Sequence, residues 1–172
     1  MKKILLLSDT HGHIDRAMEA YMSEADEVWH AGDIGTMEVS DRISALRPFR
    51  AVYGNVDNHE IRMCWPEHDV IDTSGVRVLM LHIAGSPDRY NARASELIRL
   101  HRPQVFICGH SHILKIARDR ENGLLHINPG AAGHHGFHQE RTMVRFNLHD
   151  GKIDGVEVIT LGKRGQSAKT VG

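Results

Sequence analysis

Cysteine, aromatic residues and net charge are all scarce in this chain of 172 residues, and each shortage argues against a class of protein. Cys64 and Cys108 lack the paired spacing of a zinc knuckle or a disulfide framework, and the apolar surroundings of Cys108 predict a buried free thiol. Aromatic residues make up 5% of the chain and the net charge is -1, so no basic, aromatic-rich stripe favours nucleic acid as the main substrate.

Long hydrophobic runs are missing as well. No apolar stretch approaches the ~20 residues that span a bilayer. The first apolar run, residues 4–7, stops at Ser8 and Asp9 and is too short for the core of a signal peptide. We therefore expect a soluble cytoplasmic protein with no membrane partner. The length favours one domain with a core large enough to fold without stabilising crosslinks.

Histidine is abundant instead, with 14 in the chain. A histidine-rich composition indicates metal binding only where the side chains converge. Five apolar runs that we expect to form strands each end at a possible ligand. These ligands are Asp9 and His11 after residues 4–8, Asp33 after 28–32, Asn55 after 51–54, His82 after 78–81, and His110 and His112 after 105–109. Sites in α/β sheets form at the carboxyl ends of strands, so seven O and N ligands there are enough for two ions that share one carboxylate.

Each of these motifs has a commoner explanation when it is taken alone. Asp and Asn favour turns, and a single histidine such as His82 at a strand end is more often a hydrogen-bonded, partly buried side chain. Gly109 makes the last motif more specific, because glycine permits a tight bend that aims the two following imidazoles inward. The conjunction of all five motifs, each at a strand end, is what favours a metal site.

The first half of the chain alternates strands and helices. Strands are predicted at about 3–8, 28–31 and 50–53, with helices at about 13–24 and 37–46 between them. This order favours parallel strands joined by right-handed crossovers.

The second half is predicted to be mainly antiparallel. Its elements are a hairpin of 69–74 and 76–82, a helix at 91–101, a strand at 105–108, and short strands near 113–118, 123–127, 142–148 and 153–160. The two halves predict a single α/β domain over residues 1–161, in which two sheets pack face to face with helices outside. Residues 162–172 are rich in Gly, Lys and Ser, and we expect a flexible tail there.

The motifs, in their order along residues 3–160, resemble those of the calcineurin-like metallophosphoesterases. The matching residues are Asp9-x-His11, Gly32-Asp33, Gly54-Asn55-x-Asp57, His82 and Gly109-His110-x-His112. The short length and the segment Asn128-Pro129-Gly130 are similar to the small prokaryotic phosphodiesterase branch of that family, which the retromer scaffold subunit of eukaryotes also resembles. The resemblance implies a four-layer α/β/β/α sandwich of two mixed sheets.

The resemblance also implies a dinuclear metal site. One ion is expected at Asp9, His11 and His112, the other at Asn55, His82 and His110, with Asp33 bridging the two. Two cations roughly 3.5–4 Å apart can deprotonate a shared water and clamp an in-line displacement at phosphorus. The residues implied as catalytic are Asp9, Asp33, Asn55 and His82. A mixed imidazole and carboxylate set suits Mn, Fe, Zn, Ni or Co better than Mg, and Mn is the ion expected first.

Three positions depart from the family pattern. Val56 stands where the family often has His and the small branch often has Cys, so a proton donor is missing there. Ala131 replaces the usual Ser after the Asn-Pro-Gly segment, and Ile83 follows His82 where Gly is common. The changes at Val56 and Ile83 bear on substrate choice more than on metal binding.

Several residues outside the motifs have open or ordinary assignments. His59, His134 and His135 are possible substrate contacts, any of which could replace the missing proton donor. His30 is either a packed strand residue or one that orients a ligand. The residues expected as surface charges are Arg118, Arg120 and Arg141, and the residues considered for a homo-oligomer interface are Trp29 and Trp65.

The function expected from these observations is a dinuclear metal-dependent phosphodiesterase, a hydrolase that acts on a small-molecule phosphate diester. Two alternatives stay open: a non-catalytic metal-binding scaffold, and a phosphomonoesterase or nucleotidase. A metallo-β-lactamase-type hydrolase is disfavoured because the chain has no His-x-His-x-Asp-His run.

Overall fold

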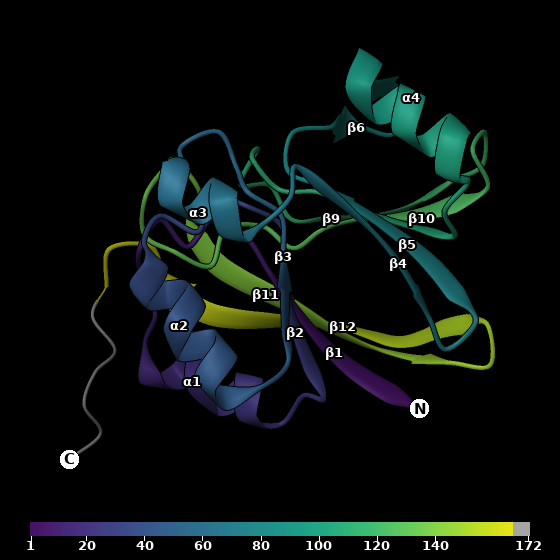
Figure 1. Cartoon of the computed structure of the whole chain (residues 1–172). Coiled ribbons are helices and arrows are strands. Elements are labelled where there is room, and N and C mark those ends of the chain that lie inside the picture. The colour runs from purple at the N-terminus through teal and green to yellow at the C-terminus, as the bar shows by residue number, and fades with distance from the viewer. Residues whose placement is uncertain (167–172) are drawn as a thin grey trace.

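Residues 1–166, the part of the chain that the computed structural model describes, form two five-stranded sheets (Figure 1). The first sheet has the strand order β12-β11-β1-β2-β3. Its strands are β1 (Lys2–Leu7), β2 (Glu27–His30), β3 (Phe49–Ala51), β11 (Glu140–His149) and β12 (Lys152–Lys163). The second sheet has the order β4-β5-β8-β10-β9. Its strands are β4 (His68–Thr73), β5 (Val76–Leu81), β8 (Val105–Ile107), β9 (Lys115–Asp119) and β10 (Leu124–Asn128).

Helices cover the outer faces of both sheets (Figure 1). The helices α1 (Arg16–Ser23), α2 (Met37–Leu46) and α3 (His59–Cys64) pack on the first sheet. The helix α4 (Ala92–His101) packs on the second, after a small hairpin of β6 (Gly85–Ser86) and β7 (Arg89–Tyr90). In each sheet three neighbouring strands are parallel and the others pair antiparallel. The predicted four-layer α/β/β/α sandwich of two mixed sheets is confirmed.

The central strand β1 shows why an unbroken apolar run forms a strand here. Side chains alternate between the two faces of a strand, and both faces of β1 are covered. Ile4 and Leu6 lie in the core between the two sheets, whereas Leu5 and Leu7 lie in the core beneath the helices. Each large apolar side chain that is fully buried in this way contributes about 1.5–3 kcal/mol of transfer free energy.

Two expectations for single side chains are wrong. Trp29 is fully buried between the sheets and its indole N–H donates to the Glu27 carboxylate at 2.8 Å, so it is not available for an interface. Arg141 is not a surface charge but is 4% exposed, because its guanidinium donates to the Ala132 carbonyl at 2.7 Å and to the Asp15 carboxylate at 2.9 Å. The partner of Arg141, Asp15, is held in its ionised form. Burial acts to raise the pKa of Asp15, but hydrogen bonds from the Met18 amide, His13 and Arg141 outweigh this effect and lower the pKa to about 2.

The boundaries of several elements also differ from the prediction. The first helix begins at Arg16 rather than near residue 13, because the Asp15 side chain caps it by accepting the Met18 N–H. The helix α3 and the β6–β7 hairpin were not predicted. The strand β12 continues to Lys163, inside the stretch expected to be a tail, and residues 167–172 of that stretch lie outside the described residues. Within residues 1–166, no helix has the length and apolar character that crossing a membrane requires.

Candidate metal centre

The carboxyl ends of strands from both sheets meet at one edge of the molecule, and six of the seven predicted ligands form two clusters there. The first cluster consists of Asp9, His11 and His112, and the second cluster consists of Asp33, His82 and His110. Within each cluster the candidate ligand atoms all lie within 4.8 Å of one another. Each cluster combines residues that follow strands of the first sheet with residues that follow strands of the second.

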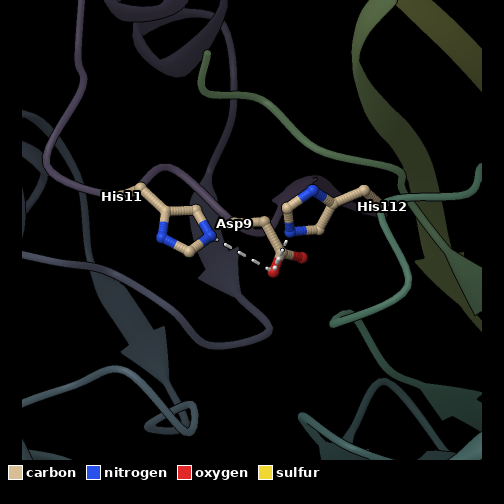
Figure 2. Close-up of side chains that lie close together, drawn as sticks. All are labelled: Asp9, His11 and His112. Atoms are coloured by element: carbon tan, nitrogen blue, oxygen red, sulfur yellow. Dashed lines mark ion pairs between the residues drawn. The ribbon is translucent and has the colours of Figure 1, made fainter. Parts of the chain in front are cut away.

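The first cluster is arranged around the buried carboxylate of Asp9, directly after β1 (Figure 2). The distance from Asp9 Oδ1 to His112 Nε2 is 3.1 Å, and the distance from Asp9 Oδ1 to His11 Nε2 is 3.9 Å. The other oxygen, Oδ2, accepts hydrogen bonds from the Ser8 hydroxyl at 2.7 Å and from the His110 N–H at 3.1 Å. Asp9 is therefore held by one oxygen and presents the other to these two imidazoles and, at 3.9 Å, to His82 Nε2 of the second cluster.

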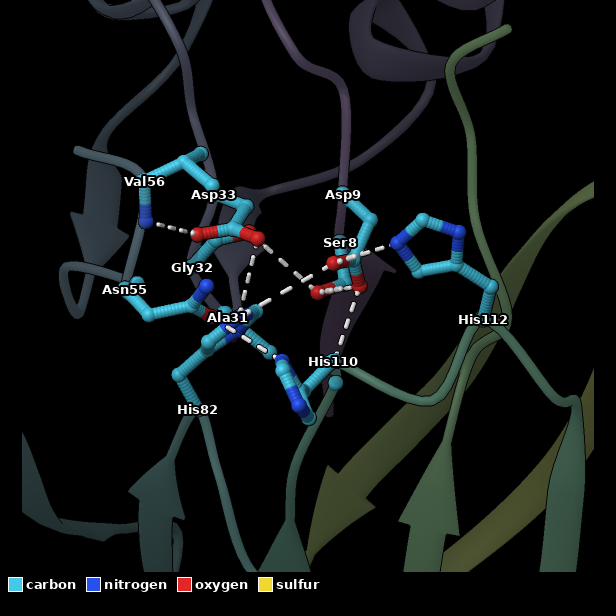
Figure 3. Close-up of polar contacts among 12 residues, drawn as sticks. Ser8, Asp9, Ala31, Gly32, Asp33, Asn55, Val56, His82, His110 and His112 are labelled. Atoms are coloured by element: carbon cyan, nitrogen blue, oxygen red, sulfur yellow. Dashed lines mark hydrogen bonds and ion pairs between the residues drawn. The ribbon is translucent and has the colours of Figure 1, made fainter. Parts of the chain in front are cut away.

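Asp33 belongs to the second cluster, where Figure 3 shows its contact with His82, and it also reaches the first. Its Oδ2 is 3.2 Å from His82 Nε2 in the second cluster and 3.6 Å from His11 Nε2 in the first. Its Oδ1 accepts the Val56 N–H at 3.0 Å, which fixes the plane of the carboxylate. A single carboxylate oxygen in reach of imidazoles from both clusters has the position that a shared ligand needs.

Asn55 stands at the rim of the second cluster. Its side chain is exposed, and its Oδ1 lies 2.9 Å from His110 Nδ1 (Figure 3). The amide oxygen therefore points at the same group of side chains as Asp33 and His82.

Unpaired buried atoms test whether these residues fit metal ions. In the described part of the chain, Asp9 Oδ1, His11 Nε2 and His82 Nε2 are buried and have no hydrogen-bond partner. Leaving such an atom unpaired costs about 1–3 kcal/mol, which a coordinated cation would offset. His82 Nδ1 lies 2.7 Å from the Ala31 carbonyl, so this nitrogen holds the proton and the lone pair of Nε2 faces the cluster. The residues fit divalent metal ions.

Electrostatics keep the two aspartates ionised. Burial acts to raise the pKa of Asp9 and of Asp33, but the facing imidazoles, chiefly His112 at Asp9 and His82 at Asp33, lower both pKa values below the usual range. Burial lowers the pKa of His11 against the opposing charges of Asp33 and Asp9. Burial also acts to lower the pKa of His82, but Asp33 and Asp9 raise it overall, so a proton competes with a cation for its Nε2.

The backbone at the ligands is strained. Five of the six clustered residues have φ in the left-handed region, which residues other than glycine seldom adopt. They are Asp9 (54°), His11 (45°), Asp33 (55°), His110 (68°) and His112 (59°). Such conformations cost of order 1–3 kcal/mol each and persist where the surroundings impose them. The turns after the strands therefore aim the side chains at one point at the expense of local stability.

Two glycines of the motifs are required by close packing at the centre. A Cβ at Gly54 would overlap the Asp33 carboxylate, and a Cβ at Gly109 would overlap the Ser8 hydroxyl and lie 2.8 Å from Asp9 Oδ2. Any side chain at either position would push a clustered carboxylate out of place.

Two residues that do not face the cluster hold its loops together. The buried carboxylate of Asp57 accepts N–H groups from Gly54 at 2.7 Å and from Gly35 at 2.8 Å, which ties the loop after β3 to the loop after β2. His30 is also buried: its Nε2 lies 2.9 Å from the Thr10 hydroxyl and its Nδ1 accepts the Gly32 N–H at 3.1 Å. Burial lowers the pKa of His30 to about 4, so it is neutral and both packs in the strand and orients the loops.

The three predicted substrate contacts lie at different distances from the clusters. The His135 ring is 4.6 Å from the His11 ring, centroid to centroid, whereas His134 packs on His13 at 4.4 Å. His59 is exposed at the start of α3 and, within residues 1–166, has no hydrogen bond or ring contact with a clustered side chain. His138, on the same loop as His134 and His135, has its ring 5.3 Å from that of His112.

A comparison with protein families gives the class of this protein. Residues 1–151 match the model of the calcineurin-like phosphoesterase superfamily domain, and the chain belongs to that superfamily. The class is a metal-using phosphoesterase, that is, a hydrolase, and the chain has two candidate metal sites of its own.

Individual relatives agree with this class. A probable metallophosphoesterase of Mycoplasma pneumoniae is 28% identical over 138 residues, which cover 76% of this chain and 79% of that protein. A probable metallophosphoesterase of Methanocaldococcus jannaschii is 28% identical over 135 residues, which cover 73% of this chain and 66% of that protein.

Solved structures share the fold. An archaeal phosphodiesterase aligns with a TM-score of 0.74 and 20% identity, covering 92% of this chain and 99% of that one. Wild-type Vps29 of Entamoeba histolytica, solved in complex with Zn²⁺, aligns with a TM-score of 0.73 and 18% identity, covering 92% and 98%. A predicted phosphoesterase of Streptococcus pneumoniae has a TM-score of 0.69 and 20% identity, covering 92% and 89%.

Proposed function

We propose that this protein is a dinuclear metal-dependent phosphodiesterase that hydrolyses a small phosphate diester. The observation that supports this most is the position of Asp33, whose Oδ2 lies within 3.6 Å of His11 Nε2 and 3.2 Å of His82 Nε2. One ion is assigned to Asp9, His11 and His112, and the other to Asn55, His82 and His110, with Asp33 bridging both. When bound, two such ions lower the pKa of a shared water and neutralise charge on the phosphoryl group.

The chain itself supplies the negative charge and the fixed geometry of this site. Asp9 and Asp33 stay ionised, and the Ala31 carbonyl holds His82 in one orientation. His135 lies against His11, where it can donate a hydrogen bond to a phosphoryl oxygen. The half-exposed Val56 side chain offers no proton to a leaving group. Catalysis therefore depends on positioning and charge stabilisation more than on general acid chemistry.

The donor set guides the choice of metal. Imidazole nitrogens and carboxylate oxygens in one site suit first-row transition metals better than Mg, and we propose Mn, with Fe, Zn, Ni and Co as the other candidates. The structurally similar Vps29 was solved in complex with Zn²⁺, which is one of these candidate metals. The proposed setting is cytoplasmic, and the proposed partners are a small-molecule phosphoester and, if the chain self-associates, a second copy, with neither nucleic acid nor membrane.

One assay separates the proposal from its alternatives. The protein reconstituted with Mn is incubated with matched phosphate monoesters and diesters, and phosphate or alcohol release is followed. We expect hydrolysis of diesters in preference to monoesters. A preference for monoesters would favour the phosphomonoesterase or nucleotidase alternative. Metal binding without hydrolysis of any ester would favour the non-catalytic scaffold, the alternative suggested by the similar fold of Vps29.

A further inference from the structure

A pocket of about 390 Å³ opens directly beside the second cluster. Asn55 and His82 form its wall toward the metal centre, and Tyr53, Leu81 and Ile83 provide apolar surface. Its volume falls in the range of roughly 300–1,000 Å³ that is typical of sites for small organic ligands. A group attached to a phosphate at the metal centre can therefore extend into this pocket.

Arg62, on α3, brings a fixed positive charge to the pocket. Its Nε donates to the Asp57 carbonyl at 2.7 Å and its Nη2 to the Asn55 carbonyl at 3.1 Å, while its guanidinium carbon lies 4.7 Å from the centre of the Tyr53 ring. All three of these groups belong to the segment 53–57 that follows β3, so the guanidinium is held beside Asn55. Across residues 1–166, no carboxylate forms an ion pair with Arg62.

Of the other charged residues that line the pocket, Arg93 and Glu67 offset each other, and Glu96, which also pairs with Arg93, lies outside the lining. Arg93, on α4, pairs with Glu67 at 2.7 Å and with Glu96 at 2.9 Å. Hydrogen bonding to Arg93 lowers the pKa of Glu67, so the pair stays ionised. What is left in the pocket is the charge of Arg62, next to an apolar wall and the metal centre.

We propose that this pocket is the specificity subsite of the enzyme and that it binds an anionic organic group, so that the substrate is a phosphodiester with a second oxyanion on one of its two arms. This inference rests on the proposed phosphodiesterase function. A guanidinium is the side chain best suited to bind a carboxylate or phosphate through paired hydrogen bonds. The carbon atoms that join the second anion to the scissile phosphate lie against Tyr53, Leu81 and Ile83.

Binding of hydrolysis-resistant analogues tests the subsite without turnover. The ligands are (4-carboxybutyl)methylphosphinate, in which both ester oxygens are replaced by carbon, and its carboxyl methyl ester, titrated by calorimetry into the Mn-loaded protein. We expect the wild type to bind the carboxylate about tenfold more tightly, a factor that corresponds to about 1.4 kcal/mol. Arg62→Gln should remove this preference and Arg62→Lys should retain part of it. Arg50→Gln, at an exposed arginine that does not line the pocket, should leave it unchanged.

A turnover assay run in parallel separates this inference from the proposed function. The substrates are p-nitrophenyl phosphodiesters whose second arm is methyl, 3-carboxypropyl or 3-phosphopropyl. A higher kcat/KM for either anionic arm, lost in Arg62→Gln, supports the subsite and shows which oxyanion it prefers. Equal affinities for the two analogues, or a preference that Arg62→Gln does not change, would overturn the subsite while diester hydrolysis stands. Binding preference without hydrolysis of any diester would instead refute the phosphodiesterase function and leave an anion-binding pocket beside the metal centre.

Discussion

The clustered side chains are held on strained backbone. Asp9, His11, Asp33, His110 and His112 all have positive φ. Within residues 1–166, the buried atoms Asp9 Oδ1 and His11 Nε2 also have no hydrogen-bond partner. At the scale of single residues the centre is therefore organised for binding at a cost in folding free energy.

The strain at His112 predicts an unusual order of stability for two substitutions. His112→Gly and His112→Ala remove the same imidazole, but only glycine adopts φ of 59° without steric cost. In the presence of chelator we expect the glycine variant to be more stable than the alanine variant by about 1 kcal/mol in urea unfolding. The matched control pair is Arg99→Gly and Arg99→Ala, inside α4. Here the order should be reversed, with the alanine variant more stable by about 1 kcal/mol. An alanine variant as stable as the glycine variant at position 112 would contradict the strain argument.

Val56 predicts how the rate responds to the leaving group. Its backbone N–H donates to Asp33, but its side chain cannot protonate a departing oxygen, a step that general acids accelerate by ~10²–10⁴-fold. Aryl diesters with acidic phenols should therefore react far faster than alkyl diesters, and Val56→His, which keeps the backbone contact, should reduce this dependence. The measurement is a series of diesters plotted against leaving-group pKa. A flat plot for the parent protein, made steep by His59→Ala, His134→Ala or His135→Ala, would show that one of these histidines is the acid.

At the scale of elements, the sequence was sufficient to predict the strands that end in ligands and insufficient to predict the segments between them. A short apolar run such as 4–7, bounded by Ser8 and Asp9, is typical of a buried strand, so its carboxyl end was predictable. The helix α3 has six residues and one fully buried side chain, Ile61, which is too short for a periodic pattern; only the cap at Asn58 marked it. The contact of His138 with His112 depends on the path of the loop between 133 and 139, which no local pattern specifies. Arg141 was misassigned because its partner, Asp15, lies 126 residues away.

Strand β10 contains a buried histidine that makes stability depend on pH. His126 is 1% exposed, lies 3.0 Å from the Tyr90 hydroxyl and contacts the Cys108 thiol, which is the predicted buried free cysteine. Burial lowers its pKa from 6.5 to about 4, with Lys115 acting in the same direction. The folded protein binds this proton less readily than the unfolded chain does, so the stabilisation is full above pH 6.5 and is lost as the pH falls toward 4.

The variant His126→Gln isolates this contribution. Between pH 6.5 and pH 4 the free energy of unfolding of the wild type should fall more steeply than that of His126→Gln, measured with chelator present. His149→Gln is the matched control. His149 is partly exposed and its pKa is raised by hydrogen bonding to Asp154, so its small contribution is lost as the pH rises rather than falls. Identical slopes for the wild type and His126→Gln would refute the assignment.

At the scale of the whole molecule, the metal centre joins the two sheets. Asp9, His11 and Asp33 follow strands of the first sheet, whereas His82, His110 and His112 follow strands of the second. Ions bound at both clusters therefore crosslink the layers that the core already packs together. A ligand that binds only the folded state at 100 times its Kd stabilises it by about 2.7 kcal/mol, so metal loading should raise the unfolding temperature.

Asp33 tests whether the two ions share a ligand. Asp33→Ala removes a charged group in reach of both clusters, and Asn55→Ala removes one neutral amide at the rim of the second. We expect Asp33→Ala to lose diester hydrolysis almost completely and Asn55→Ala to retain part of it. Equal and mild losses in the two variants would contradict the bridging role.

The metal content of the reconstituted protein is the most direct test of the dinuclear centre. The wild type is stripped with chelator, loaded with Mn or Zn, freed of excess ions and measured by elemental analysis against protein concentration. The two clusters predict two ions per chain at neutral pH, and fewer on acidification, because the imidazoles and carboxylates must be deprotonated to coordinate. A folded protein that retains one ion or none under these conditions would contradict the account.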